Sequence, residues 1–242
     1  MNLQVLSCCA IAITLTSCAV HSPSASLNPA STSQSAGSAQ KSEESLTKLS
    51  ISELEQRVAK GDSLAKAELG ARYGKGEGVE QNLDKAIELL REAAATGEAE
   101  AEFFLGTAYY SGLGVPLSEA EAVLWFEKAA AKGHAAAQYW LAVLIKEGRG
   151  GISPSWSAAV HLLWESAMQG YGDAEFLLGY AYQTGSGVEK NPEAAAYWYR
   201  RNLSKAYNNR SHFNLALMIN EGEVEWRPGD PEGLKPPSSE RH

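Results

Sequence analysis

An internal repeat of 36 or 37 residues constrains the fold of this chain more than any other feature of its sequence. Pairs of leucine with glycine or alanine recur at steps of 36, 36, 37 and 37 residues: Leu69-Gly70, Leu105-Gly106, Leu141-Ala142, Leu178-Gly179 and Leu215-Ala216. Two further series of glycines keep nearly the same spacing: Gly61, Gly97, Gly133 and Gly170, and Gly78, Gly114, Gly150 and Gly187. Three series in phase predict an array of structural repeats.

Each unit of the repeat contains two stretches with helical periodicity. In the second unit, Ala101, Leu105 and Ala108 fall at i, i+4 and i+7 and form one apolar stripe, and residues 122–130 form another. The glycines within 112–115 permit the positive φ that ends a helix and turns the chain. Helix pairs this short cannot bury their apolar faces alone, so we expect successive pairs to stack.

The second unit resembles a Sel1-like repeat nearly position for position. The matching positions are 101–106, Tyr109, 112–116, Ala122, Trp125-Phe126, Ala129-Ala130 and Gly133-His134-Ala135. The resemblance covers roughly residues 50–222, and the unit at 136–170 departs from it by one extra loop residue. Ordinary tetratricopeptide repeats match less well, because their period is about 34 residues and they lack the glycine-rich loop.

The resemblance implies an all-α fold, a right-handed α/α superhelix (solenoid) of about four Sel1-like helix-turn-helix repeats with capping helices. The N-terminal cap is expected at 50–60, where Ser50 and Glu53 have the spacing of a capping box. The C-terminal cap is expected from Ser211 onward, where the glycine-rich turn is lost. Sel1-like proteins resemble one another as adaptors that bind other proteins, so the resemblance implies a protein partner and no enzymatic activity.

The N-terminal segment indicates export. An apolar stretch too short to span a membrane ends in Leu15-Thr16-Ser17-Cys18, which resembles the lipobox of bacterial lipoproteins. This implies that 1–17 is a lipoprotein signal peptide, that Cys18 carries lipid, including palmitate, and that Ala19 directs the protein to the outer membrane, facing the periplasm or the cell surface. The residues before the apolar stretch include no Lys or Arg, so a cytosolic adaptor is an alternative.

Composition divides the rest of the chain into three parts. Residues 18–48 are rich in Ser and Ala without apolar periodicity and are expected to form a disordered tether. Residues 49–226 are expected to form the solenoid, and the Pro-rich residues 227–242 a disordered tail. The formal charge of −8 disfavours a nucleic-acid partner, because such binding requires a basic surface.

The sequence predicts no catalytic, metal or cofactor site. No two of its five histidines have the i, i+4 spacing of metal ligands, and all three cysteines lie in the first eighteen residues. Ser-x-x-Lys occurs at 45–48 and 63–66 but lacks the other motifs of penicillin-recognising enzymes, so a cell-wall or β-lactam-interacting enzyme is only the alternative reading. Glu98 and Glu102 have the spacing of solvated carboxylates on a helix surface.

A partner-binding face is expected on the first helices, which line the concave side of related solenoids. Just before each Leu-Gly pair, or two residues after its leucine, the middle repeats carry apolar residues: Phe104, Trp140, Val143, Leu177 and Tyr180. These could form a ribbon for a peptide or extended partner, with Trp and Tyr as anchors. The alternative is that they seal one repeat against the next. The other aromatics at recurring positions are expected in the core: Trp125, Phe126, Trp164, Tyr197 and Trp198.

The function expected from these features is that of a lipid-anchored scaffold of the bacterial envelope. The membrane contact would be made through the N-terminal lipid alone, and the partner would be another envelope or secreted protein.

Overall fold

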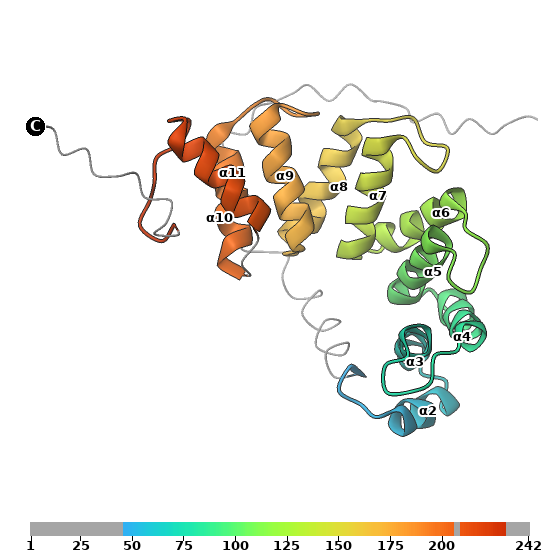
Figure 1. Cartoon of the computed structure of the whole chain (residues 1–242). Coiled ribbons are helices and arrows are strands. Elements are labelled where there is room, and N and C mark those ends of the chain that lie inside the picture. Colours follow the sequence, from blue (N-terminus) through green and yellow to red (C-terminus); the bar gives the residue numbers. More distant parts are fainter. Residues whose placement is uncertain (1–45, 206–208, 231–242) are drawn as a thin grey trace, which may run out of the picture. The chain divides into compact units, whose positions relative to one another are not determined.

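The computed structural model describes residues 46–205 and 209–230, and every named element in this part is an α-helix (Figure 1). The helices are α2 (Ile51–Ala59), α3 (Ser63–Lys75), α4 (Leu83–Ala95), α5 (Ala99–Ser111), α6 (Glu119–Ala131), α7 (Ala135–Glu147), α8 (Trp156–Met168), α9 (Gly172–Thr184), α10 (Pro192–Lys205) and α11 (Asn209–Asn220). The expected signal peptide, Cys18, most of the tether and residues 231–242 lie outside the described residues. Among those described, no helix is long and apolar enough to cross a membrane.

The helices form four antiparallel pairs that stack in chain order. The four repeats are the pairs α3/α4, α5/α6, α7/α8 and α9/α10. The second helix of each repeat packs on the helix that follows it in the chain. The α2 helix packs on α3 and the α11 helix packs on α10, which confirms the two predicted caps. The chain is therefore an all-α solenoid, as the repeat predicts.

The helix ends follow from specific side chains. The Ser50 hydroxyl accepts a hydrogen bond from the backbone N–H of Glu53, and the Glu53 carboxylate accepts one from the backbone N–H of Ser50, so the predicted capping box is present. The second helices of three repeats begin after Asn82, Ser118 and Ser155, whose side-chain oxygens each accept a backbone N–H of the first turn. The first helices end at glycines in the left-handed conformation.

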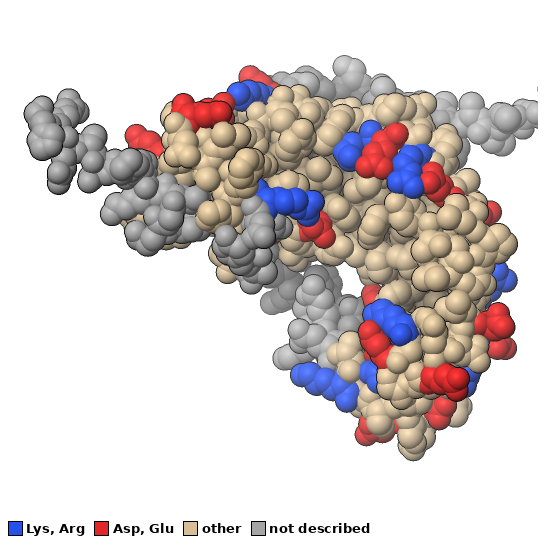
Figure 2. Space-filling model, viewed as in Figure 1, with Lys and Arg blue, Asp and Glu red and all other residues tan. Residues whose placement is uncertain are grey.

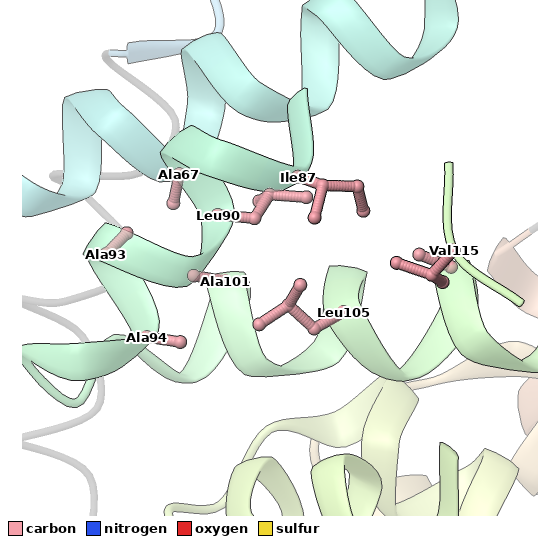
Figure 3. Packing of buried hydrophobic residues seen from close by; sticks show 9 residues of the cluster. Ala67, Ile87, Leu90, Ala93, Ala94, Ala101, Leu105 and Val115 are labelled. Atoms are coloured by element: carbon pink, nitrogen blue, oxygen red, sulfur yellow. The ribbon is translucent and has the colours of Figure 1, made fainter. Parts of the chain in front are cut away.

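The recurring leucine lies at the centre of each repeat. Leu105 is fully buried, and Ile87 and Leu90 of α4 project toward it across the first interface between repeats (Figure 3). Gly106, the residue after Leu105, faces the second helix of the repeat at short distance. A Cβ on Gly106 would lie 2.6 Å from the ring of Phe126. The Leu-Gly pair therefore marks the closest approach of the two helices of a repeat.

The loop glycine has a separate role between repeats. Gly187 has φ +70°, and a Cβ there would lie 2.4 Å from the backbone carbon of Trp156, the first residue of the preceding repeat's second helix. A Cβ on Gly150 would likewise lie 2.9 Å from the carbonyl oxygen of Glu119 in the repeat before. Only a residue without a side chain allows this backbone contact, which explains why the glycine recurs with the period of the repeat.

Both ends of the solenoid lie a few residues beyond the expected bounds of 49 and 226. Leu46 is buried against the cluster formed by α2 and α3, and its carbonyl accepts a hydrogen bond from Arg72. At the other end, Asp230 is buried and both of its carboxylate oxygens accept hydrogen bonds from Arg200, at 2.7 and 2.9 Å. Hydrogen bonds and burial thus fix short segments that composition assigns to the tether and the tail.

Two expectations about burial are wrong. Phe126 and Trp198 are buried as predicted, but Trp164 and Tyr197 are 47% and 55% exposed, because they lie on the outer side of the second helices. Glu102, expected in solvent, is 4% exposed and lies between the two helices of its repeat, with one carboxylate oxygen 2.6 Å from Lys132 Nζ.

Candidate partner-binding face

The residues predicted to bind a partner lie on the first helices of the middle repeats. We call the positions one before and two after each recurring leucine the first-helix face: Glu68, Ala71, Phe104, Thr107, Trp140, Val143, Leu177, Tyr180, Asn214 and Leu217. Phe104, Trp140, Val143 and Leu177 are half-buried, and Tyr180 and Leu217 are each 39% exposed. Some residues of the face therefore pack between repeats, and others leave apolar surface accessible to a partner.

Trp140 is mainly a packing residue. Its ring stacks on the buried ring of Phe126 and lies 5.2 Å from the ring of Tyr110, which belongs to the preceding first helix. Tyr139 meets the same indole edge-on. Burial raises the pKa of Tyr139 to about 12, and the nearby Asp173 carboxylate adds to this rise, so the phenol beside Trp140 is neutral at physiological pH.

Tyr180 is the more accessible aromatic residue of the face. Its ring lies 6.3 Å from that of Trp156, and the Lys146 ammonium lies 5.5 Å from the Trp156 ring centroid. Trp156 is the first residue of α8, where the other repeats have Leu83, Glu119 and Pro192. It is not among the residues predicted to bind a partner, although its departure from the pattern of the repeat is visible in the sequence.

Phe104 borders a cavity lined mainly by apolar residues. The cavity, of about 290 Å³, opens between α3, α4 and α5 and is lined mainly by Gly70, Gly74, Ile87, Leu90, Phe104 and Ala108. The Lys75 ammonium lies 5.5 Å from the centroid of the Phe104 ring. An open apolar cavity with few polar groups is a recognised form of ligand site.

Charged residues beside the face are largely paired with one another. Arg149 binds Glu119 and donates a hydrogen bond to the Tyr110 hydroxyl at 3.0 Å, and its hydrogen bond to Glu119 is the main cause of the lowered pKa of that carboxyl. Figure 2 shows Lys and Arg next to Asp and Glu in small groups on the visible face, with neutral surface between them. The surface visible in Figure 2 therefore has no continuous patch of one charge.

The residues considered for the alternative of a cell-wall or β-lactam-interacting enzyme have other partners in the part of the chain that the structure describes. Lys66 of the Ser63-x-x-Lys66 motif points its ammonium to Glu92, at 2.8 Å, and the second Ser-x-x-Lys begins outside the described residues. His134 accepts a hydrogen bond from the Ala137 backbone at the start of α7 and binds Glu100 at 2.8 Å, which is a helix-capping arrangement. In the described residues no group of His, Cys, Asp and Glu could hold a metal ion.

Comparison with known proteins agrees with this architecture. The model of the Sel1 repeat matches residues 63–97, 99–134, 135–171 and 172–201. A comparison with curated proteins found no match. Among solved structures, a protective antigen present in uropathogenic Escherichia coli strains, c5321, which displays an SLR fold, is 34% identical with a TM-score of 0.66, over 72% of this chain and 37% of that one.

Two other solved structures extend the comparison. A Sel1 repeat protein from Oxalobacter formigenes is 28% identical with a TM-score of 0.64, over 69% of this chain and 48% of that one. A Sel1 repeat protein from Klebsiella pneumoniae subsp. pneumoniae is 20% identical with a TM-score of 0.51, over 77% of this chain and 88% of that one, and shows the shared fold alone. The chain thus matches less than half the length of the first two structures.

Proposed function

The chain belongs to the Sel1 repeat family, whose members are generally protein-interaction scaffolds, and on that basis we propose that it is a lipid-anchored scaffold of the bacterial envelope. In this proposal Cys18 carries the lipid, and the first-helix face holds another envelope or secreted protein. The solenoid would stand away from the outer membrane on the Ser- and Ala-rich segment that follows Cys18.

The observation that carries the proposal is the apolar character of the first-helix face. Its middle positions hold Phe104, Trp140 and Leu177, all half-buried, while Tyr180 and Leu217 expose more than a third of their surface. Rigid aromatic side chains that are partly exposed on a stable helix make effective anchors, because little conformational entropy is lost when a partner covers them. A row of apolar side chains on successive first helices suits a peptide or an extended segment.

The envelope location is supported by the lipobox-like sequence that ends at Cys18. One of the similar structures is a protective antigen of uropathogenic Escherichia coli strains, and a location accessible from outside the cell would be in keeping with that property. The location is tested by fractionation and mass measurement of wild type and Cys18→Ser. Wild type is expected in the outer membrane with acyl chains attached, and Cys18→Ser without them; a cytosolic wild-type chain would contradict the proposal.

The binding face is tested by cross-linking and pull-down from native membranes. The variant Trp140→Ala plus Tyr180→Ala is compared with Trp164→Ala plus Tyr197→Ala, which removes the same residue types from the exposed side of the second helices. Since Trp140 also packs in the core, the single variant Tyr180→Asp is added because Tyr180 is the more exposed of the two residues, and its folding is checked by circular dichroism. Loss of one specific envelope partner in the first and third variants but not the second supports the proposal. An unchanged set of partners in all three would place the binding surface elsewhere.

A further inference from the structure

The cavity beside Phe104 lies where the first repeat has a glycine, Gly74, and a leucine, Leu90, at two facing positions. The position of Gly74 carries Tyr110, Lys146 and Gln183 in the next three repeats. The position of Leu90 carries Phe126, Leu163 and Tyr199. Gly74 therefore leaves open a space bordered by Ile87 and Leu90, whereas each later repeat has a side chain at the position of Gly74.

The second repeat shows which group fits this space. Tyr110, at the position of Gly74, places its ring 5.2 Å from Trp140, which has the position of Phe104. Its hydroxyl accepts a hydrogen bond from Arg149, whose guanidinium carbon lies 5.1 Å from the Tyr110 ring centroid. The chain thus fills the second interface with an aromatic ring between an aromatic wall and a cation.

The first interface also has an aromatic wall and a cation, without the ring, but its cation comes from another position: Lys75 lies on α3, and Leu113 stands where the second interface has Arg149. Phe104 forms the wall, and the Lys75 ammonium, on a side chain that is 54% exposed, lies 5.5 Å from its centroid at the mouth of the cavity. A cation complements the negative face of an aromatic ring, and it offers no such attraction to an aliphatic side chain. The volume of about 290 Å³ exceeds the roughly 150 Å³ that suffices for benzene in an engineered apolar cavity.

We propose that the cavity between α3, α4 and α5 binds a Phe or Tyr side chain presented by the protein partner, in the place that Tyr110 occupies one repeat later. This inference rests on the proposed function, because it assumes a protein partner on the first-helix face. The two terminal segments outside the described residues, 1–45 and 231–242, contain no Phe, Tyr or Trp, so neither can supply the ring.

A filled-cavity variant makes the inference testable. A Cβ on Gly74 meets only the Cβ of Ala86, at 3.7 Å, so Gly74→Tyr can enter the cavity without displacing backbone. The control is Thr184→Tyr, which adds the same side chain to the exposed end of α9 in a repeat with another neighbourhood. For the binding measurement both variants are made in the full-length chain with Cys18→Ser, so that no lipid or detergent competes for the apolar cavity. For the pull-down both variants keep Cys18.

The first measurement uses p-cresol, which is the side chain of tyrosine as a free molecule, with methylcyclohexane as the aliphatic comparison. Binding is followed by NMR shifts of the Ala86 and Ala108 methyl groups. We expect p-cresol to bind wild type and Thr184→Tyr equally and Gly74→Tyr at least tenfold more weakly, with methylcyclohexane weaker than p-cresol on wild type. Equal affinity of the two probes, no shift at the solubility limit, or unchanged binding by Gly74→Tyr would overturn the inference.

The second measurement repeats the membrane pull-down with Gly74→Tyr and Thr184→Tyr. Loss of the partner from Gly74→Tyr alone supports the inference. Retention of the partner by Gly74→Tyr, when Tyr180→Asp loses it, overturns the inference and leaves the proposed function standing. If all these variants keep the same partners, both fail. If wild type dimerises in solution and Gly74→Tyr is monomeric, the ring belongs to a second copy of the chain, which also overturns the assignment to a different protein.

Discussion

The carboxylate of Glu102 lies 2.6 Å from the ammonium of Lys132 and joins the two helices of the second repeat. The same position is polar in the other three repeats and is bonded across the pair in each. Lys66 binds Glu92, Gln138 donates to Glu165, and Glu175 binds Arg201. In the first repeat the lysine lies on the first helix and the carboxylate on the second, and in the third repeat the amide of Gln138 donates to the carboxylate of Glu165. A polar contact between the two helices is therefore present in all four repeats, with different chemical groups.

Removing one member of this pair should be costly. Glu102 is 4% exposed and its second carboxylate oxygen has no hydrogen-bond partner, so Lys132→Met leaves a buried charge without compensation. We expect a loss of about 1–3 kcal/mol in the free energy of unfolding, below the full cost of a broken buried pair because the Lys132 side chain is 39% exposed. Urea unfolding followed by circular dichroism measures it.

The matched control is Lys190→Met. Its partner is Glu223, and the lysine side chain is 54% exposed, so we expect a change below about 1 kcal/mol. The double variant Glu102→Leu plus Lys132→Met should recover most of the loss, because it removes the charge together with its partner. Equal effects of the two single variants would show that burial of Glu102 has no energetic consequence.

The central glycines of the first two repeats should respond differently to alanine. In Gly106→Ala the new Cβ meets the ring of Phe126 at 2.6 Å, and that ring is held by Phe103 and Trp140, so overpacking should cost about 1–3 kcal/mol. In Gly70→Ala the Cβ meets Leu90 at 3.0 Å. Leu90 borders the cavity and can shift into it, so we expect a cost at least about 1 kcal/mol smaller.

Thermal or urea unfolding of both variants provides the comparison. Since alanine favours a helix interior over glycine by about 1 kcal/mol in either repeat, that contribution cancels in the difference. Gly70→Ala serves as the control for Gly106→Ala, and the difference is also an independent check of the cavity. A larger loss for Gly70→Ala would mean that the space around Leu90 is filled.

The loop glycine should be more sensitive than its positive φ alone requires. Gly187→Ala combines the strain of φ +70° with a Cβ 2.4 Å from the backbone of Trp156, which cannot rotate away. Gly151 is the control, because it has φ +85° and nothing within 4 Å of a built Cβ. We expect Gly151→Ala to cost about 1 kcal/mol and Gly187→Ala at least about 2 kcal/mol more. Similar costs in urea unfolding would argue against the contact between repeats.

The sequence predicts those parts of this fold that repeat. Leucine followed by glycine or alanine recurs because the two helices of a repeat pack closely at this position, so the repeat pattern alone places Leu105 and Gly106 in the core. The same logic fails for single residues. Glu102 is expected in solvent because its spacing from Glu98 is that of carboxylates on a helix surface. Only the residues at the same position in the other repeats, Lys66, Gln138 and Glu175, indicate an inward polar position.

The exposed aromatic residues and the cavity are further features that the repeat pattern does not predict. Trp164 and Tyr197 lie on the outer side of their helices, at the edge of an apolar stripe. The helical period alone does not tell which edge of such a stripe is buried and which is exposed. The cavity arises from what Gly74 lacks, which becomes visible only when it is compared with Tyr110, Lys146 and Gln183. Differences between repeats therefore locate candidate sites better than the shared pattern does.

Tyr199 should make the solenoid sensitive to alkaline pH. Its side chain is fully buried against Gly179 in the fourth repeat, its hydroxyl donates to Gln183 at 2.8 Å, and burial raises its pKa to about 12. An unfolded tyrosine titrates near 10. Because the folded state holds the Tyr199 proton more tightly than the unfolded state does, the free energy of unfolding keeps its full value below about pH 10. It then falls as the pH rises toward 12.

The test is the free energy of unfolding between pH 8 and pH 12 for wild type, Tyr199→Phe and Tyr197→Phe. Tyr199→Phe should be less stable at pH 8, because Gln183 and Asn214 lose their hydrogen-bond partner. It should then lose less stability than wild type above pH 10, so the two curves converge. Tyr197, which is 55% exposed, should leave the alkaline slope unchanged when it is replaced. Parallel curves for wild type and Tyr199→Phe would show that Tyr199 ionises as readily in the folded protein as in the unfolded chain.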